Sequence, residues 1–332
     1  MKKKVNVCIL GTGSMGTALA RLFSFNGCEV KMWGIDKEAI YNINSIHENI
    51  NFLPGVKLNT DISATLEIAE AVKKAKIIVV AIPSQVVSKV FDRAKNYLNK
   101  EQIILSASKG IEIESGLTIT RVIKNKLPRE WHGNIAVLMG PLFASEISTD
   151  VPTVGLIATP KITVFKILKK VLQNNNFFVR YSSDVTGAEL GGALKNVYAI
   201  ILGVCDGLGY GWNTKSAAMT AAVKEMALVG HYLGGQKETF YGLAGLGDLL
   251  TTGFGEKSRN RRFGEKVCSG QSVGEVLKDI GQVVEGSSTV KILIKLLKKS
   301  KIKTPLLNAV FALVNDQKNP CQLMHKILEK TS

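Results

Sequence analysis

Gly11-Thr12-Gly13-Ser14-Met15-Gly16 lies between two segments of different character, and this arrangement decides the fold of the first half of the chain. The preceding segment, Val5–Leu10, has the β-branched content of a buried parallel strand, and Thr17–Phe23 has the pattern of a helix. This order is the dinucleotide-binding fingerprint, in which Gly11 permits the tight turn, Gly13 lets the backbone approach a pyrophosphate, and Gly16 lets the helix pack on the sheet. The free N–H groups and positive dipole end of the helix would then face the phosphates.

A second predicted strand, Glu29–Trp33, leads to a candidate ribose-binding residue, Asp36. Asp36 lies 20 positions beyond Gly16, a spacing at which a carboxylate suits the adenosine ribose and favours NAD. The neighbouring Lys37 instead suits the 2′-phosphate of NADP. The choice between NAD and NADP therefore stays open. An ordinary loop aspartate is the alternative interpretation of Asp36.

Further segments have strand character and recur at the intervals of βα units. They are Lys76–Ala81, Ile103–Ser106, Ile135–Met139, Val154–Ala158 and Phe177–Tyr181. An open parallel sheet binds its ligand at the carboxyl ends of its strands. Lys109 follows one of these strands and the turn Gly140–Ala144 follows another, so we expect both near the ligand. A surface lysine is the alternative for Lys109.

From about residue 184 the sequence changes to long helical stretches. These are Ala188–Val204, Lys215–Tyr232, Ser272–Ile280, Ser287–Leu297 and Thr304–Val314. We therefore predict an α/β Rossmann-type domain with a mostly parallel sheet over residues 1–186. An all-helical substrate-binding domain is predicted over residues 187–332.

The stretch Glu189–Asn196 (Glu-Leu-Gly-Gly-Ala-Leu-Lys-Asn) opens the helical half. On a helix Lys195 shares a face with Gly191 and Gly192, and Asn196 lies one step round. Each glycine costs a helix about 1 kcal/mol relative to alanine, so something is expected to come close to the backbone there. A lysine in a crowded, partly dry pocket is suited to proton exchange. The alternative is a close helix–helix contact with Lys195 directed at water.

A second polar cluster contains Asp248 and Thr252 and then Ser258-Arg259-Asn260-Arg261-Arg262. Hydroxyl, guanidinium and amide donors in a short turn suit a phosphate monoester. Ser258, Arg259 and Asn260 are therefore expected to bind ligand, and Asp248 and Thr252 suit hydrogen bonds to a polyol. Arg261 and Arg262 are interpreted as a solvated basic loop.

Length and composition bound the remaining possibilities. At 332 residues and 45% hydrophobic, the chain is long enough for two domains with real cores. The net charge of +16 comes mostly from scattered lysines, which favours a solvated basic surface, then attraction to small anions, and lastly nucleic-acid binding. No zinc-finger spacing, aromatic RNA-binding signature or arginine-rich tract supports that last class.

Cysteine and histidine usage indicates neither disulfides nor a metal. The five cysteines are widely spaced without a Cys-x-x-Cys pair, which indicates a reducing compartment. The four histidines have no metal-like spacing. The N-terminal residues lack the apolar region of a secretory signal, and no run approaches the roughly 20 apolar residues of a membrane span. A cytoplasmic protein without a membrane span is expected.

Several motifs together resemble the bacterial-type NAD(P)-dependent glycerol-3-phosphate dehydrogenases, and the resemblance covers nearly the whole chain. They are Gly11–Ala20, Phe52-Leu53-Pro54-Gly55, Ser108-Lys109-Gly110, Gly140–Ala144, Glu189–Asn196, Gly245-Leu246-Gly247-Asp248, Ser258–Arg262 and Gly281–Gly286. The glycine fingerprint alone fits many dehydrogenases, whereas the later motifs in this order are specific.

The resemblance implies roles for individual residues. Lys195 matches the proton acceptor, and Lys109 would be a second ammonium group at the same substrate oxygen. The implied substrate contacts are Lys109, Gly140, Leu142, Lys195, Asn196, Asp248, Thr252, Ser258, Arg259 and Asn260. The implied cofactor contacts, besides Gly11, Gly13, Gly16 and Asp36, are Ser14, Met15, Lys109, Ala144, Arg259, Val283 and Glu285.

Three positions depart from the family's pattern. Met15 stands where an aromatic residue is frequent, so stacking there would become a thioether contact. Leu142 stands where a hydroxyl residue is usual. A side-chain hydrogen bond to the substrate would be lost there, whereas a backbone contact would remain. Ile35 replaces a polar residue near the ribose, which weakens an NADP preference.

The implied reaction is the reversible oxidation of sn-glycerol 3-phosphate to dihydroxyacetone phosphate with NAD or NADP and without a metal. Its reductive direction would supply phospholipid synthesis. A homodimer is expected only because symmetric oligomers are common. One alternative is a hydroxy-acid or ketopantoate dehydrogenase that binds a carboxylate at Ser258–Asn260. Another is a non-catalytic nucleotide sensor or a nucleic-acid-binding scaffold.

Overall fold

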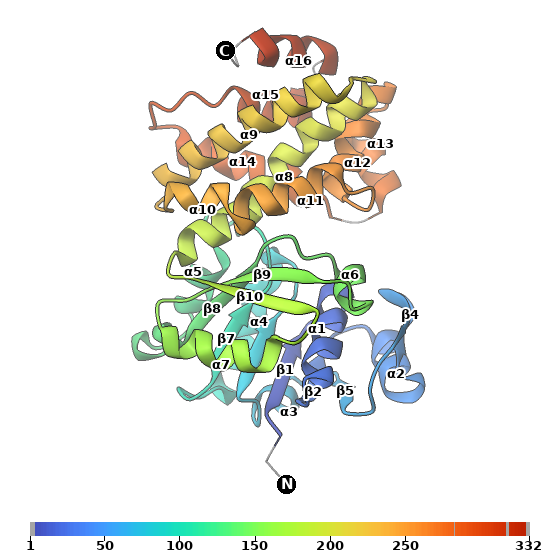
Figure 1. Cartoon of the computed structure of the whole chain (residues 1–332), viewed down its shortest axis with the longest axis vertical. Helices are drawn as coiled ribbons and strands as arrows, with labels where there is room; N and C mark the ends of the chain where they lie inside the picture. The colour runs from blue at the N-terminus through green and yellow to red at the C-terminus, as the bar shows by residue number, and fades with distance from the viewer. Residues whose placement is uncertain (1–3, 282, 317–318, 330–332) are drawn as a thin grey trace. The chain divides into compact units, whose positions relative to one another are not determined.

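The computed structural model describes residues 4–281, 283–316 and 319–329, which form two compact units. The first unit comprises Met1–Lys109 and Leu117–Val185, and the second comprises Gly110–Gly116 and Thr186–Ser332. Figure 1 shows the strands in the first unit and the long helices in the second.

The first unit is built on a mixed sheet of order β10-β9-β8-β7-β6-β1-β2-β5. Its strands are β1 (Asn6–Leu10), β2 (Glu29–Trp33), β5 (Ile62–Thr65), β6 (Ile77–Val80), β7 (Ile103–Ser106), β8 (Ile135–Met139), β9 (Thr153–Ala158) and β10 (Phe177–Ser182). All neighbours pair in parallel except β8 and β9, so the predicted mostly parallel sheet is confirmed. Because β9 and β10 run the other way, their carboxyl ends lie at the opposite edge from those of β1, β6, β7 and β8.

Both faces of this sheet are covered, which explains its apolar strands. Along β1, Val7 and Ile9 belong to a core shared with α1 (Ser14–Phe25) and α7 (Ile162–Leu172). The alternate residues Cys8 and Leu10 belong to a second core shared with α3 (Ile68–Val72), α4 (Val87–Ala94) and α5 (Ile119–Lys124). The remaining elements of the unit include α2 (Lys37–Ile46), α6 (Ala144–Ser148) and a small antiparallel pair, β3 (Glu48–Asn49) with β4 (Leu53–Lys57).

The second unit is helical, as predicted. Its helices are α8 (Val185–Gly207), α9 (Trp212–Tyr232), α10 (Lys237–Tyr241), α11 (Asp248–Phe254), α12 (Arg259–Lys266), α13 (Val273–Ile280), α14 (Glu285–Leu297), α15 (Pro305–Asp316) and α16 (Pro320–Glu329). A π-helical turn, η4 (Leu243–Gly247), leads directly into α11. The sequence patterns predict α8, α9, α13, α14 and α15 but not α10, α11, α12 or α16.

Helix α8 is the centre of the second unit. It is apolar on all sides, and its residues from Gly187 to Cys205 are buried. Among the residues that the structure describes, it is the one helix long and apolar enough to cross a membrane, and its whole apolar window is buried inside the protein. An all-round apolar helix in this position is the core around which the others pack.

A buried carboxylate on α9 caps the start of α15. Glu225 is only 4% exposed, and its oxygens accept hydrogen bonds from the backbone N–H groups of Leu306 (2.9 Å) and Leu307 (2.8 Å). The hydroxyl of Tyr198 also donates to it, at 3.3 Å. Burial raises the pKa of Glu225 to about 7, against the opposing effect of these three hydrogen bonds.

We expect this residue to make the stability of the protein pH-dependent. Its folded pKa of about 7 lies above the ordinary value of 4.5, so its stabilising contribution is full below about pH 4.5 and is lost as the pH rises through 7. At about 1.4 kcal/mol per pKa unit, the shift corresponds to roughly 3 kcal/mol.

The measurement is urea unfolding of the parent protein and Glu225→Gln at several pH values from 5 to 8. The free energy of unfolding of the parent should fall relative to that of the variant as the pH rises. Parallel pH profiles would show that Glu225 does not titrate in this range.

Candidate active site

The glycine turn after β1 has the geometry that its sequence predicts. Gly11 has a φ of +123°, and a Cβ there would overlap the carbonyl oxygen of Ala81. A Cβ on Gly16 would overlap the carbonyl oxygen of Gly11, so this glycine keeps α1 close to the strand. A Cβ on Gly13 would meet no atom within 4 Å. Space beside Gly13 and an α1 N-terminus without a side-chain cap fit a pyrophosphate group.

The neighbouring predicted cofactor residues have structural partners of their own. The hydroxyl of Ser14 donates to the carbonyl oxygen of Phe52 at 2.6 Å, and Met15 packs against the sheet core. Asp36 caps α2, because its Oδ1 accepts from the N–H groups of Glu38 (3.0 Å) and Ala39 (3.1 Å). Its role at a ribose stays a prediction.

Three strand ends meet at the carboxyl edge of the sheet. After β7, the hydroxyl of Ser108 donates to the carbonyl oxygen of Ile82, which follows β6, at 2.6 Å. The ammonium group of Lys109 donates to the carbonyl oxygen of Gly140, after β8, at 3.1 Å. Gly140 has a φ of +115°, a conformation that favours glycine. The structure therefore brings Lys109 and the predicted turn after β8 together.

Two residues near this turn have different surroundings. Leu142 is 6% exposed and its side chain belongs to the sheet core, so this side chain is not available to a ligand. Ala144 is the first residue of α6 and is half-buried.

In the helical unit, Lys195 lies in a buried polar cluster. Its ammonium group donates to Asp248 Oδ1 and to Thr252 Oγ1, both at 2.6 Å. Lys195 is 6%, Asp248 1% and Thr252 4% exposed. The two acceptors lie four residues apart on α11 and therefore on one face of it. Lys195 is therefore not directed at water, which removes that part of the alternative interpretation of this motif.

Gly191 explains how this cluster forms. It lies one helical turn before Lys195, and a Cβ there would be 2.5 Å from the carbonyl oxygen of Ala244. The absence of a side chain therefore lets the π-helical turn η4 contact α8, and η4 delivers Asp248 to Lys195. The close approach predicted from the paired glycines is real, and the approaching group is protein backbone.

A chain of amide hydrogen bonds lies next to Lys195. The side chain of Asn260, on α12, donates to Asn196 Oδ1 on α8 at 2.9 Å, and its own Oδ1 accepts from the N–H of Gly286 at 2.9 Å. A Cβ on Gly286 would overlap the carbonyl oxygen of Asn196, so α14 also contacts α8 directly. These contacts fix Asn196 and Asn260, which are 5% and 7% exposed, relative to Lys195.

The segment predicted as a Ser-Arg-Asn turn is instead the start of α12. Ser258 caps the helix, because its hydroxyl oxygen accepts from the N–H of Arg261 at 3.3 Å. Arg259, the first helical residue, is exposed, whereas Asn260 points into the protein. Arg259 is therefore available to an anion.

The interpretation of Arg261 and Arg262 as a solvated loop is wrong. Both belong to α12. The side chain of Arg261 is only 15% exposed and forms an ion pair with Asp206 at 2.6 Å. The prediction fails because the acidic partner lies 55 positions earlier in the sequence.

The last predicted cofactor motif lies at the start of α14. Val283 is 55% exposed, Glu285 is the first helical residue, and Gln282 of the same motif lies outside the described residues. The roles of Val283 and Glu285 at a cofactor stay predictions.

The other reactive side chains do not suggest a different chemistry. Burial raises the pKa of Cys28 and of Cys268 to about 11 and that of Cys205 to about 12, which disfavours a thiolate nucleophile. Within the described ranges, no three His, Cys, Asp or Glu side chains are placed to hold a metal ion.

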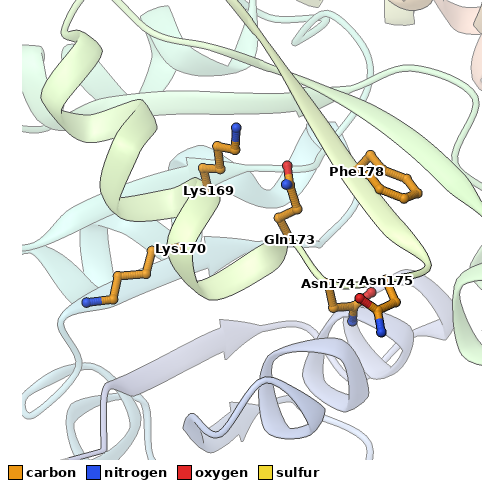
Figure 2. A pocket seen from close by; sticks show the side chains of 6 residues that line it. All are labelled: Lys169, Lys170, Gln173, Asn174, Asn175 and Phe178. Atoms are coloured by element: carbon orange, nitrogen blue, oxygen red, sulfur yellow. The ribbon is translucent and has the colours of Figure 1, made fainter.

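Two surface depressions lie apart from these residues. One, of about 620 Å³, lies on the first unit and is lined by Lys169, Lys170, Gln173, Asn174, Asn175 and Phe178, whose side chains are drawn in Figure 2. The other, of about 730 Å³, lies beside Glu225 in the helical unit. Neither contains a predicted site residue.

The open glycine turn suits a dinucleotide, and the buried lysine of the helical unit suits proton exchange with a hydroxyl or carbonyl group. Enzymes that combine the two are nicotinamide-dependent dehydrogenases, and the fold and the site assign the chain to this class. The chain belongs to the NAD-dependent glycerol-3-phosphate dehydrogenase family: the family's N-terminal part matches residues 6–164 and its C-terminal part matches residues 184–325.

Known relatives agree with this assignment over at least 92% of their length. A glycerol-3-phosphate dehydrogenase [NAD(P)+] of Bacillus velezensis is 40% identical over 319 residues, which cover 96% of this chain and 92% of the relative. The crystal structure of glycerol-3-phosphate dehydrogenase from Coxiella burnetii is 30% identical, with a TM-score of 0.91 and coverage of 98% and 99%. The enzyme from Saccharomyces cerevisiae is 26% identical, with a TM-score of 0.86 and coverage of 99% and 100%.

Proposed function

We propose that the chain interconverts dihydroxyacetone phosphate and sn-glycerol 3-phosphate, with NAD(H) or NADP(H) as the redox partner. The observation that carries this proposal is the buried cluster of Lys195, Asp248 and Thr252 beside the Asn196–Asn260 hydrogen bond and the start of α12. Family membership supports the same substrate pair.

Lys195 is the proposed proton carrier. During reduction its ammonium group gives a proton to the oxygen at C2 of the substrate, and during oxidation its amine takes the hydroxyl proton. Asp248 and Thr252 orient the amine, because each accepts one of its N–H groups at 2.6 Å. The predicted contacts of Asp248 and Thr252 with the substrate itself remain part of the proposal.

Arg259 is the proposed phosphate ligand. Its guanidinium group is exposed at the first turn of α12, where N–H groups and the helix dipole also favour an anion. Ser258 and Asn260 support this turn. Binding at the phosphate would orient C2 without taking part in the chemistry.

Bound nicotinamide carries the hydride, and the protein positions it. The turn Gly11–Gly16 and the start of α1 would hold the pyrophosphate, with Ser14 and Met15 beside it and Asp36 toward the ribose. Lys109, Ala144, Val283 and Glu285 are further proposed contacts. Lys109 is also proposed as the second ammonium group that polarises the carbonyl oxygen.

In the cell the reductive direction would supply glycerol 3-phosphate for phospholipid synthesis. We propose a cytoplasmic location, supported by five cysteines of which none forms a disulfide. A homodimer is the proposed assembly.

The decisive experiment is a steady-state assay that follows the absorbance of reduced nicotinamide. Dihydroxyacetone phosphate, unphosphorylated dihydroxyacetone, ketopantoate and simple 2-keto acids would each be tested with NADH and with NADPH. We expect turnover of dihydroxyacetone phosphate to exceed that of every other substrate. Preference for a keto acid would instead favour the alternative dehydrogenases, and salt-dependent nucleic-acid binding without redox activity would favour a non-catalytic protein.

A further inference from the structure

Asp206, near the end of α8, joins three helices close to the proposed phosphate site. Its Oδ1 accepts from the ammonium group of Lys215 on α9, and its Oδ2 accepts from Arg261 Nε on α12, both at 2.6 Å. The side chains of Asp206, Lys215 and Arg261 are 18%, 9% and 15% exposed. Because these charges are largely removed from water, breaking the cluster would leave them buried without partners.

The same cluster also contacts α11. The ammonium group of Lys215 lies 4.6 Å from the centre of the Phe254 ring, at the end of the helix that begins with Asp248. A cation at this distance from an aromatic ring is attracted to it. Asp206, itself on α8, is therefore connected to α11 and α12, the two other helices that carry proposed substrate residues.

The backbones of α8 and α12 are in contact. The orientation of α12 therefore depends on the side chains that join the two helices, including Asp206 and Arg261. A Cβ on Gly203 would overlap the carbonyl oxygen of Arg261, and a Cβ on Gly264 would overlap that of Ile200. These contacts fix how close the helices lie, but two side-chain-free surfaces do not by themselves fix the rotation of one against the other. At the N-terminal turn of α12, the Asp206–Arg261 ion pair supplies this constraint together with the Asn260–Asn196 hydrogen bond.

We propose that Asp206 is a positioning residue for the phosphate end of the substrate. Through Arg261 it holds the first turn of α12, where Arg259 and Asn260 precede Arg261 directly. The N–H of Arg261 is bonded to Ser258 and its Nε to Asp206, so both its backbone and its side chain are held. This inference rests on the proposed function and adds a residue that does not touch the substrate.

The test compares Asp206→Asn, Arg261→Gln and the double variant with Glu265→Gln. Glu265 is a matched control because it pairs with the other end of Arg261, at 3.5 Å, but its side chain is 44% exposed. We expect either change to the Asp206–Arg261 pair to raise the KM for dihydroxyacetone phosphate by about tenfold or more, with kcat and the KM for NADH nearly unchanged. The KM of the double variant should be no higher than that of the single variant with the higher KM, because both changes break the same ion pair. Glu265→Gln should have the KM of the parent.

Unphosphorylated dihydroxyacetone distinguishes positioning from a general structural role. The variants should reduce it as well as the parent does, because the lost alignment concerns the phosphate. A lower Tm with unchanged KM, or a loss of kcat alone, would overturn the proposal. If Asp206→Asn does not fold, Arg261→Gln decides, since it keeps the Asp206–Lys215 pair. Failure of the proposed function itself would appear separately, as absence of dihydroxyacetone phosphate reduction by the parent.

Discussion

Replacing Lys195 by alanine is expected to lower kcat for dihydroxyacetone phosphate reduction by about 1,000-fold or more, the size of a lost general acid. The structure gives the reason: this ammonium group is buried and held at 2.6 Å by both Asp248 and Thr252, so no solvent-exposed lysine can replace it. The affinity for NADH should stay nearly unchanged, because the proposed pyrophosphate site lies on the other unit. Steady-state kinetics and a fluorescence titration with NADH measure the two quantities.

A double variant shows whether the loss of activity in Lys195→Ala comes from the missing proton carrier or from a less stable protein. Lys195→Ala removes one partner of a buried ion pair, the ammonium group that donates to Asp248 Oδ1, which is expected to lower the free energy of unfolding by about 3 kcal/mol or more. Lys195→Met combined with Asp248→Asn removes both charges and keeps the volume, so it should recover stability but not activity. Added methylamine should partly restore turnover to Lys195→Ala. Normal turnover by the alanine variant would refute the lysine mechanism.

Most of the fold could be predicted because it depends on local patterns. The bounds of β2, β7 and β8 agree with the predicted segments, and Gly11 and Gly16 have the predicted tight turn and close helix packing. Strand direction is less accessible, because the alternation of side chains is the same in either direction. The antiparallel pairing of β8 with β9 therefore could not be predicted from β9 itself.

The candidate site was only partly predictable, for a different reason. The sequence singles out Lys195, Asn196 and Asn260 because polar groups next to paired glycines or in a donor-rich segment are unusual, and the structure places all three in one buried polar region of the helical unit. Their partners depend on contacts between distant segments: Asp248 reaches Lys195 only because Gly191 admits the backbone of Ala244. No pattern near Arg261 in the sequence indicates Asp206 as its partner, so the Asp206–Arg261 ion pair could not be predicted.

Helices α11 and α12 were missed because their sequences favour turns locally. Thr251-Thr252-Gly253 and Ser258 are weak helix formers, and glycines interrupt the pattern on both sides. In the folded unit these small residues allow close packing, and tertiary contacts with α8 outweigh the local preference. Gly253 illustrates this, since an added Cβ would overlap the side chain of Leu202 on α8.

The same packing leads to the second large expected effect, which concerns stability. Changing Gly203 to alanine is expected to lower the free energy of unfolding by about 3 kcal/mol or more, the upper range for overpacking a core. The new Cβ would overlap the carbonyl oxygen of Arg261 and lie 2.8 Å from its carbonyl carbon and 3.0 Å from its Cα. All three are backbone atoms, so α12 itself must move.

Gly274→Ala is the matched control, since it makes the same change at another helical glycine. Nothing lies within 4 Å of an added Cβ at Gly274, the second residue of α13, so alanine should stabilise the protein slightly, by up to about 0.5 kcal/mol, through helix propensity alone. Thermal and urea unfolding of the two variants should therefore shift in opposite directions. Because α12 carries Arg259 and Asn260, any folded fraction of Gly203→Ala should also bind dihydroxyacetone phosphate more weakly. Equal stability of the two variants would mean that α8 and α12 do not pack through their backbones.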